Sequence, residues 1–206
     1  SSAIVSFGGQ LPNNIALDLT KNDVKVLGTT TASIDSCEDR DKYSSLLDRL
    51  SINQPEWTTV SSLKDATKFC SSVGYPVLLR PSYVLSGAAM NIARNETELD
   101  FALTEAAQIS NDHPVVITKY IENALEIDVD AVAKDGEDKA IAISEHIENA
   151  GVHSGDATLV LPAQKLNPST RKKILRDTQK IASALKVNGP FNSQFIIKDD
   201  WIGVIE

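Results

Sequence analysis

Two arginines in this chain are candidates for contact with phosphate. Arg80 ends an apolar run with the composition of a β-strand, and it shortly precedes the small residues Ser86 and Gly87. A guanidinium matches the oxygens of a phosphate, and a loop of small residues lets main-chain N–H groups approach the same ligand. This arrangement is typical of a triphosphate site, although spacing alone favours an ordinary surface arginine followed by a loop. Arg40, midway along a charged helical stretch, fits a surface residue more strongly still.

The densest group of polar and small residues is Gly151–Asp156. Glycines there bracket His153 and Ser154, a composition that suits a turn facing a ligand. A connecting loop with a solvated histidine is an equally good interpretation. The other histidines, His113 and His146, are given no functional role, and no spacing typical of a zinc site occurs.

Near its end the chain offers oxygen donors in Asn192, Gln194 and Glu206. Mg²⁺ prefers oxygen ligands, and an amide oxygen plus a carboxylate on adjacent strands would supply them. A polar strand face toward solvent is the commoner arrangement for such residues. If Gln194 and Glu206 share one ion, their side chains must lie on the same face of the sheet, because side chains alternate along each strand.

The loop between the last two expected strands decides that geometry. A two-residue loop, 199–200, would turn Glu206 away from Gln194, whereas a three-residue loop, 199–201, would set the two residues opposite each other. We predict the three-residue loop or, failing that, a β-bulge near Gly203 that restores the same facing.

Residues 126–133 alternate between polar and apolar side chains, which predicts a strand with one buried face. The polar row is Glu126, Asp128 and Asp130, and such an acidic row is usually a solvated face. Glu126, at the start of the strand, is placed to meet a ribose hydroxyl. The pair 135–136, Asp-Gly, is a hairpin signal that joins this strand to the next.

The elements that must position these residues alternate between strand and helix, which predicts an α/β fold. Expected strands cover residues 24–27, 76–80, 115–121, 126–133, 139–147, 191–197 and 201–205. Expected helices cover residues 37–50, with Ser36 as the cap, and residues 62–73, 98–110 and 168–187. The first and last residues fall inside expected strands, so we expect a chain that is cut at both ends.

Composition narrows the class of partner. The formal net charge is −8 and the pI is near 4.9, which disfavours nucleic acid as a partner but not a phosphate ligand held by a few focused cations. No apolar run approaches the length of a membrane span, so no membrane partner is expected. The cysteines, Cys37 and Cys70, show no metal-type spacing, which favours a reducing compartment such as the cytosol, hence a cytoplasmic location.

Four stretches carry a resemblance to a known family, namely Gly8–Asn14, Glu38–Arg40, Leu79–Met90 and Ser144–Thr158. Together they resemble the second, C-terminal synthetase half of the carbamoyl-phosphate synthase large chain. The resemblance runs over essentially the whole chain and implies an ATP-grasp fold (α/β or α+β) preceded by the end of a pre-ATP-grasp domain. It assigns residues 1–35 to that end, 36–118 to the N-terminal lobe and lid, and 119–206 to a truncated C-terminal lobe.

The resemblance also implies roles for individual residues. The phosphates would be contacted by the catalytic pair Arg40 and Arg80, under a loop that contains Ser86 and Gly87. Adenine would be held by Lys119 and Ile121, ribose by Glu126, and the nucleotide further by Gly151, Val152, His153 and Ser154. Mg²⁺ (or Mn²⁺) would be bound by Gln194 and Glu206. The family's pattern continues past that glutamate to an Asn ligand and an Arg, so this chain is expected to hold an incomplete metal site.

The implied reaction is transfer of the γ-phosphoryl group of ATP to carbamate, which gives carbamoyl phosphate and ADP. Such a transfer relies on positioning and charge neutralisation rather than on a protein nucleophile. The implied partners are the other synthetase half and a glutaminase that supplies ammonia, and the isolated chain is expected to be inactive. The stretch Lys119–Ala124 favours the multifunctional pyrimidine enzymes over the arginine-specific ones. The alternatives are a nucleotide-binding module without turnover and another ATP-grasp ligase, such as a biotin carboxylase.

Overall fold

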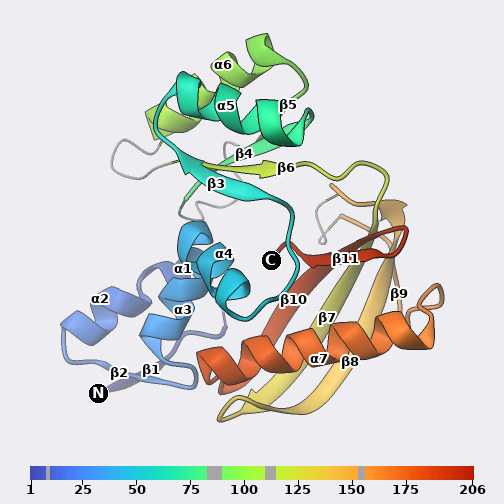
Figure 1. Cartoon of the computed structure of the whole chain (residues 1–206). Helices are drawn as coiled ribbons and strands as arrows, with labels where there is room; N and C mark the ends of the chain where they lie inside the picture. Colours follow the sequence, from blue (N-terminus) through green and yellow to red (C-terminus); the bar gives the residue numbers. More distant parts are fainter. Residues whose placement is uncertain (8–9, 83–89, 110–114, 153–155) are drawn as a thin grey trace. The chain divides into compact units, whose positions relative to one another are not determined.

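The computed structural model describes residues 1–7, 10–82, 90–109, 115–152 and 156–206. Contacts divide the chain into two compact units (Figure 1). The first unit comprises Ser1–Ser36, Leu47–Gln54 and Glu122–Glu206, and the second comprises Cys37–Leu46 and Pro55–Ile121. The three-part domain division expected from the sequence stays a prediction.

The first unit begins with a small parallel sheet and short helices. Strand β1 (Ser2–Ile4) pairs in parallel with β2 (Lys25–Leu27), which confirms the strand predicted near residues 24–27. Between them lie the short helices α1 (Gln10–Asn14) and α2 (Ala16–Lys21), which have no counterpart in the sequence analysis. Both are too short to show a helical repeat of apolar residues, and that is the reason they escaped detection.

The helix expected over residues 37–50 is divided in two, and Ser36 is not its cap. Helix α3 (Thr31–Glu38) already contains Ser36, whose hydroxyl donates to the Ala32 carbonyl at 2.9 Å. Helix α4 (Arg40–Arg49) begins after Asp39. The Asp39 carboxylate accepts main-chain N–H groups of the next turn, those of residues 41 and 42, at 3.1 and 3.3 Å. Asp39 is therefore the capping residue, and its bonds restart the helix at Arg40.

The second unit contains an antiparallel four-stranded sheet in the order β3-β6-β4-β5. Its strands are β3 (Trp57–Val60), β4 (Val77–Pro81), β5 (Asn91–Ala93) and β6 (Val115–Lys119). Helices α5 (Leu63–Val73) and α6 (Glu96–Ile109) pack on this sheet and on each other. The apolar core between them is fully buried at Ala66, Val77, Leu79, Ala93, Leu99, Ala106 and Ile117. The helix predicted over residues 62–73 is confirmed: Ser62 caps α5 by accepting the Asp65 N–H, and Gly74 follows the helix at φ +73°.

The first unit also contains an antiparallel five-stranded sheet in the order β11-β10-β7-β8-β9. Its strands are β7 (Leu125–Lys134), β8 (Glu137–Asn149), β9 (Leu159–Val160), β10 (Gly189–Lys198) and β11 (Trp201–Val204). Helix α7 (Pro168–Leu185) lies along one face of the sheet (Figure 1). Asn167 caps this helix by accepting the Thr170 N–H at 2.8 Å, and Pro168 opens it, as expected of proline.

The mixed helix-and-sheet class is confirmed. Both larger sheets are antiparallel, so α+β is the accurate description, whereas parallel pairing is confined to β1 and β2 among the described residues. No helix in the described part of the chain has the length and apolar composition needed to span a bilayer.

Candidate nucleotide and metal site

The two faces of β7 carry different chemistry. Ile127 and Val129 are fully buried on the face that we assign to α7, whose apolar residues are buried as well. The opposite face carries Glu126, Asp128 and Asp130, as the alternation predicted. The expectation of a solvated acidic row is wrong for two of these residues, because Glu126 and Asp128 are only 4% and 3% exposed. Buried carboxylates need hydrogen-bond partners, and the neighbouring strand provides one.

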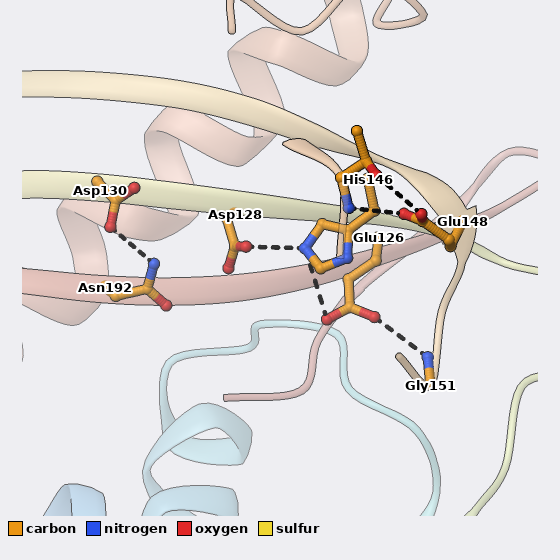
Figure 2. Close-up of polar contacts among 8 residues, drawn as sticks. Glu126, Asp128, Asp130, His146, Glu148, Gly151 and Asn192 are labelled. Atoms are coloured by element: carbon orange, nitrogen blue, oxygen red, sulfur yellow. Dashed lines mark hydrogen bonds and ion pairs between the residues drawn. The ribbon is translucent and has the colours of Figure 1, made fainter. Parts of the chain in front are cut away.

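That partner is His146 on β8, which is completely buried (Figure 2). One ring nitrogen, Nε2, lies 2.8 Å from Asp128 Oδ2 and 4.0 Å from Glu126 Oε1. The sequence assigned no functional role to His146. Its polar environment results from a register shift in the β7–β8 ladder, between Val132 and Ala133. Without that shift, Glu145 rather than His146 would lie across from Glu126.

A second contact of Glu126 comes from the end of β8. The Gly151 N–H donates to Glu126 Oε2 at 3.3 Å (Figure 2). The Ala150 N–H donates to the Ala124 carbonyl at 2.8 Å, which holds the start of this segment beside the start of β7. Glu126 and Gly151, predicted to bind one nucleotide, therefore meet in the structure. Val152 follows as an exposed residue, whereas His153 and Ser154 lie outside the described residues.

Glu148 ties both ends of the same segment together. Its carboxylate accepts the Thr158 main-chain N–H at 2.9 Å and the Thr158 hydroxyl at 3.0 Å. These bonds favour the ionised carboxylate, so the pKa of Glu148 lies below its ordinary value of 4.5, with the N–H bond as the largest cause. The segment that presents Gly151 is thus closed at its base by a charged hydrogen bond.

The electrostatic environment of Glu126 is dominated by its burial. Loss of hydration raises the pKa of Glu126 above its ordinary value of 4.5. The Gly151 hydrogen bond and the charge of His146 act in the opposite direction, and the charges of Asp128 and Glu206 raise the pKa further. A hydrogen-bond donor or a cation bound beside Glu126 would therefore stabilise its ionised carboxylate.

The hairpin of β10 and β11 corrects one prediction and confirms its fallback. Lys198 pairs with Trp201, so the loop has two residues, Asp199 and Asp200, and the predicted three-residue loop is wrong. At the far end, the Gln194 N–H donates to the Glu206 carbonyl at 2.7 Å, while the Gln194 carbonyl accepts the Ile205 N–H at 2.9 Å. Two residues of one segment thus face a single residue, which is a β-bulge just beyond Gly203.

The residues at this bulge fit a hard cation. Gln194 pairs with Asp128 on β7, which places it on the acidic face of the sheet. Glu206 lies close enough to Glu126 for its charge to raise the pKa of that carboxyl. Asp128 Oδ1 is buried and has no hydrogen-bond partner among the described residues. An amide oxygen and carboxylates around excess negative charge are the donor set that Mg²⁺ prefers. Within the described residues, no group of three or more His, Cys, Asp or Glu side chains forms a metal cluster.

The two predicted phosphate-binding arginines lie together in the second unit. Arg80 is half-buried near the end of β4. Arg40, at the start of α4, donates its main-chain N–H to the Ser82 carbonyl at 2.8 Å and its guanidinium Nη1 to the Pro81 carbonyl at 3.0 Å. Arg40, well separated from β4 in the sequence, thus lies against the end of the strand that carries Arg80. The predicted loop residues Ser86 and Gly87 lie outside the described residues.

The predicted adenine-binding residues lie at the end of β6. The Lys119 ammonium donates to the Gly74 and Tyr75 carbonyls at 3.1 and 2.8 Å. Its side chain is therefore engaged by the end of α5, and its main-chain N–H donates to the Glu56 carbonyl at 2.8 Å. Ile121 follows the strand and is half-buried.

Comparison with solved structures identifies the class of fold. A biotin carboxylase complex with β-γ-ATP from Campylobacter jejuni superposes with a TM-score of 0.81 at 20% identity, over 100% of this chain and 48% of that chain. The biotin carboxylase domain of the Hydrogenobacter thermophilus 2-oxoglutarate carboxylase gives 0.79, also at 20% identity, over 100% of this chain and 47% of that chain. The chain has the ATP-grasp fold, and at this identity the likeness to biotin carboxylase concerns the fold alone.

Residues 39–206 match the family model "Carbamoyl-phosphate synthase L chain, ATP binding domain", and the chain belongs to this family. It is 57% identical over 206 residues to the multifunctional protein pyrABCN of Emericella nidulans and 54% identical to the multifunctional protein URA2 of Saccharomyces cerevisiae. It is 53% identical over 203 residues to the mitochondrial carbamoyl-phosphate synthase [ammonia] of Aquarana catesbeiana. All or nearly all of the chain is covered, but it spans only 9%, 9% and 14% of these relatives.

Proposed function

We propose that this chain binds ATP and transfers its γ-phosphoryl group to carbamate, as the second synthetase half of a carbamoyl-phosphate synthase large chain. One observation, taken with membership of the family, supports this best. Glu126 and Gly151, which the family resemblance assigns to one nucleotide, are joined by a hydrogen bond of 3.3 Å. A carboxylate fixed beside a glycine can accept hydrogen bonds from ribose hydroxyls, while the glycine lets the main chain approach the nucleotide closely.

Phosphoryl transfer is assigned to the second unit. Arg40 and Arg80 would neutralise charge that develops on the transferred group, and Ser86 and Gly87 would cover the triphosphate. The carbonyl groups of Pro81 and Ser82 hold Arg40 at the end of β4, which limits its motion before ATP arrives. Pre-positioned donors of this kind act without reorganisation during the reaction.

Nucleotide recognition is shared among several segments in the proposal. Glu126 accepts from ribose, while Gly151, Val152, His153 and Ser154 line the nucleotide. Lys119 and Ile121 contact adenine with groups other than the Lys119 ammonium and N–H, which donate to carbonyls of the chain itself.

Gln194 and Glu206 would hold Mg²⁺, or Mn²⁺ in its place. The bound ion supplies positive charge to the triphosphate and lowers the cost of bringing ATP to the acidic sheet face. The structure of a relative in fold was solved with MgADP, which supports Mg²⁺ as the natural ion. Glu206 and Gln194 contribute the oxygen ligands of the described chain.

The wider assignment follows from the relatives. We assign the chain to pyrimidine synthesis, because the multifunctional proteins pyrABCN and URA2 are 57% and 54% identical to it. Ammonia would come from a glutaminase and carbamate from the other synthetase half, in the cytoplasm. The 53% identity to the enzyme named for ammonia leaves free ammonia as the competing nitrogen source. The domain division at residues 35 and 118 belongs to the same proposal.

The test is the reverse reaction of the full-length protein, in which ADP and carbamoyl phosphate give ATP. Arg80→Ala should slow this reaction by about 100-fold or more, while bicarbonate-dependent ATP hydrolysis, assigned to the other synthetase half, continues. Loss of both reactions or of neither would contradict the assignment of carbamate phosphorylation to this chain. Nucleotide binding with no reverse reaction in the wild type would identify a non-catalytic binding module instead.

A further inference from the structure

We propose that His146 is a positioning residue, which holds the Glu126 carboxylate in the orientation that accepts the ribose hydroxyls of ATP. The proposal rests on the ribose-binding role of Glu126 proposed above. It adds a residue to which the sequence assigned nothing, and it explains why a histidine is buried on an acidic sheet face.

The contacts of Glu126 define the geometry. His146 Nε2 lies 4.0 Å from Oε1, and the Gly151 N–H donates to Oε2 at 3.3 Å (Figure 2). The carboxylate is therefore approached by one group on each oxygen, one from β8 and one from the segment that follows β8. The ring itself is fixed by Asp128, whose Oδ2 lies 2.8 Å from the same Nε2.

The backbone does not fix the direction of Glu126 on its own. The β7–β8 ladder changes register between Leu125 and Ile127, whose partners are Asn149 and Glu145. Glu126 thus lies inside an irregularity, where a strand bends and its side chains are redirected. The orientation of the Glu126 side chain must therefore come from its side-chain contacts, whereas the regular pleat orients the other side chains of β7.

Charge gives a second reason for a donor at this place. Glu126 and Asp128 are both buried on one face of β7, and Glu206 adds a further negative charge near Glu126. Neighbouring buried carboxylates repel each other and lose their hydration. Among the described residues, His146 Nε2 lies 4.0 Å from Glu126 Oε1 and 2.8 Å from Asp128 Oδ2, so one ring nitrogen serves both carboxylates. Its Nδ1 has no hydrogen-bond partner there, so the ring is held from its Nε2 side.

Discrimination between ATP and 2′,3′-dideoxy-ATP tests this role, because only ATP carries ribose hydroxyls. Dissociation constants of both nucleotides are measured with Mg²⁺ on the full-length protein. The ratio of interest is the dissociation constant of 2′,3′-dideoxy-ATP divided by that of ATP. In the wild type this ratio should be about ten or more, as expected from a hydrogen bond to a charged group. His146→Leu, which keeps bulk without a donor, should bring the ratio close to one. His146→Gln, whose amide can donate from a similar place, should restore most of it.

Asp130→Ala is the matched control. Asp130 lies on the same strand face and accepts from Asn192 at 2.9 Å, yet it does not contact Glu126 in Figure 2. Its removal should leave the ratio unchanged. If His146→Leu does not fold, Asp128→Asn takes its place, because a looser ring should also lower the ratio.

The contradicting outcomes are distinct. A folded His146→Leu protein, or a folded Asp128→Asn protein used in its place, that keeps the wild-type ratio overturns the positioning role. Glu126→Gln decides the underlying assignment. If Glu126→Gln leaves the ratio unchanged, the ribose-binding role of Glu126 is wrong and the positioning role fails with it. If Glu126→Gln lowers the ratio and the His146 variants do not, only the positioning role is wrong.

Discussion

Gln194 and Glu206 are joined through their main chains, by an N–H···O bond of 2.7 Å from residue 194 to residue 206. The same Gln194 also accepts the Ile205 N–H, so it faces two consecutive residues. A hairpin with a two-residue loop and no bulge would oppose Gln194 to Ile205 and turn Glu206 to the other face. The bulge therefore decides whether both residues can serve one cation.

Glu206→Gln and Gln194→Leu should each raise the Mg²⁺ concentration needed for half-maximal reverse reaction by about tenfold or more. The physical reason is the loss of one oxygen ligand or of its charge. A Mg²⁺ titration of the full-length protein measures the effect. Asp200→Asn, which neutralises an exposed carboxylate in the turn of the same hairpin, should leave the titration unchanged. Equal Mg²⁺ requirements in all variants would remove both residues from the metal site.

Arg80→Ala should lower kcat for carbamate phosphorylation by about 100-fold or more, as expected when one donor to the developing charge is lost. Arg80→Lys should recover only part of the rate, because an ammonium cannot bind two oxygens in one plane. Steady-state kinetics of the full-length protein measure both. The exposed Arg94 of the same unit provides the control, and Arg94→Ala should keep the wild-type rate. Unchanged kinetics in Arg80→Ala would exclude Arg80 from the site.

Local signals allowed much of the fold to be predicted. The helices predicted over residues 62–73 and 168–187 correspond to α5 and α7, and Asp135 lies in the predicted tight turn with positive φ. Each of these signals acts within a few residues, where sequence and geometry are directly coupled. The hairpin at residues 199–200 shows the limit. A three-residue loop was predicted so that Gln194 and Glu206 could share one metal ion. In the structure Asp199 adopts φ +53° and closes a two-residue turn.

The candidate site was less accessible to prediction. Glu126 and Gly151 came from resemblance rather than from periodicity, and His146 was missed. The contacts of His146 depend on a one-residue register shift at Val132, and a shift of that kind leaves no mark in hydrophobic alternation. A buried acidic pair opposite a histidine would have been the signal, but only with the register already known.

Glu126→Gln should make the chain more stable at neutral pH. Burial raises the pKa of Glu126 in the folded state above its ordinary value of 4.5, so the unfolded chain loses this proton first as the pH rises. Stability from the protonated form is complete below pH 4.5 and is lost as the pH rises through the folded pKa. Urea unfolding of wild type and variant should therefore agree in acid and separate toward neutrality. A variant less stable than wild type at pH 7 would contradict burial as the dominant influence.

Gly136→Ala should destabilise the chain by about 2 kcal/mol or more, through backbone strain and overpacking together. Gly136 has φ +81°, and an added Cβ would lie 2.9 Å from Ser183 Cα on α7. Gly189→Ala is a matched control, because Gly189 has φ +130° with nothing within 4 Å of the added Cβ. It should cost only the strain, about 1 kcal/mol. Equal losses in urea unfolding would show that α7 does not pack tightly on this turn.

The isolated 206-residue chain should bind ATP at least about tenfold more weakly than the full-length protein and should make no carbamoyl phosphate. The chain spans 9% of the relative pyrABCN, and the proposed source of carbamate lies outside it. Calorimetric titration and a coupled assay measure these properties. Steady carbamoyl phosphate synthesis by the isolated chain would contradict the division of labour proposed above.

The alternation along β7 has a consequence for how such a protein can diverge. Residues 127 and 129 support the helix-covered side, while residues 126 and 128 face the candidate ligand side. Substitutions at even-numbered positions can change what is bound while the odd-numbered ones keep the chain folded. Enzymes that share this fold but act on different phosphoryl acceptors can therefore keep the same core. They need to differ only at every second residue of the strand.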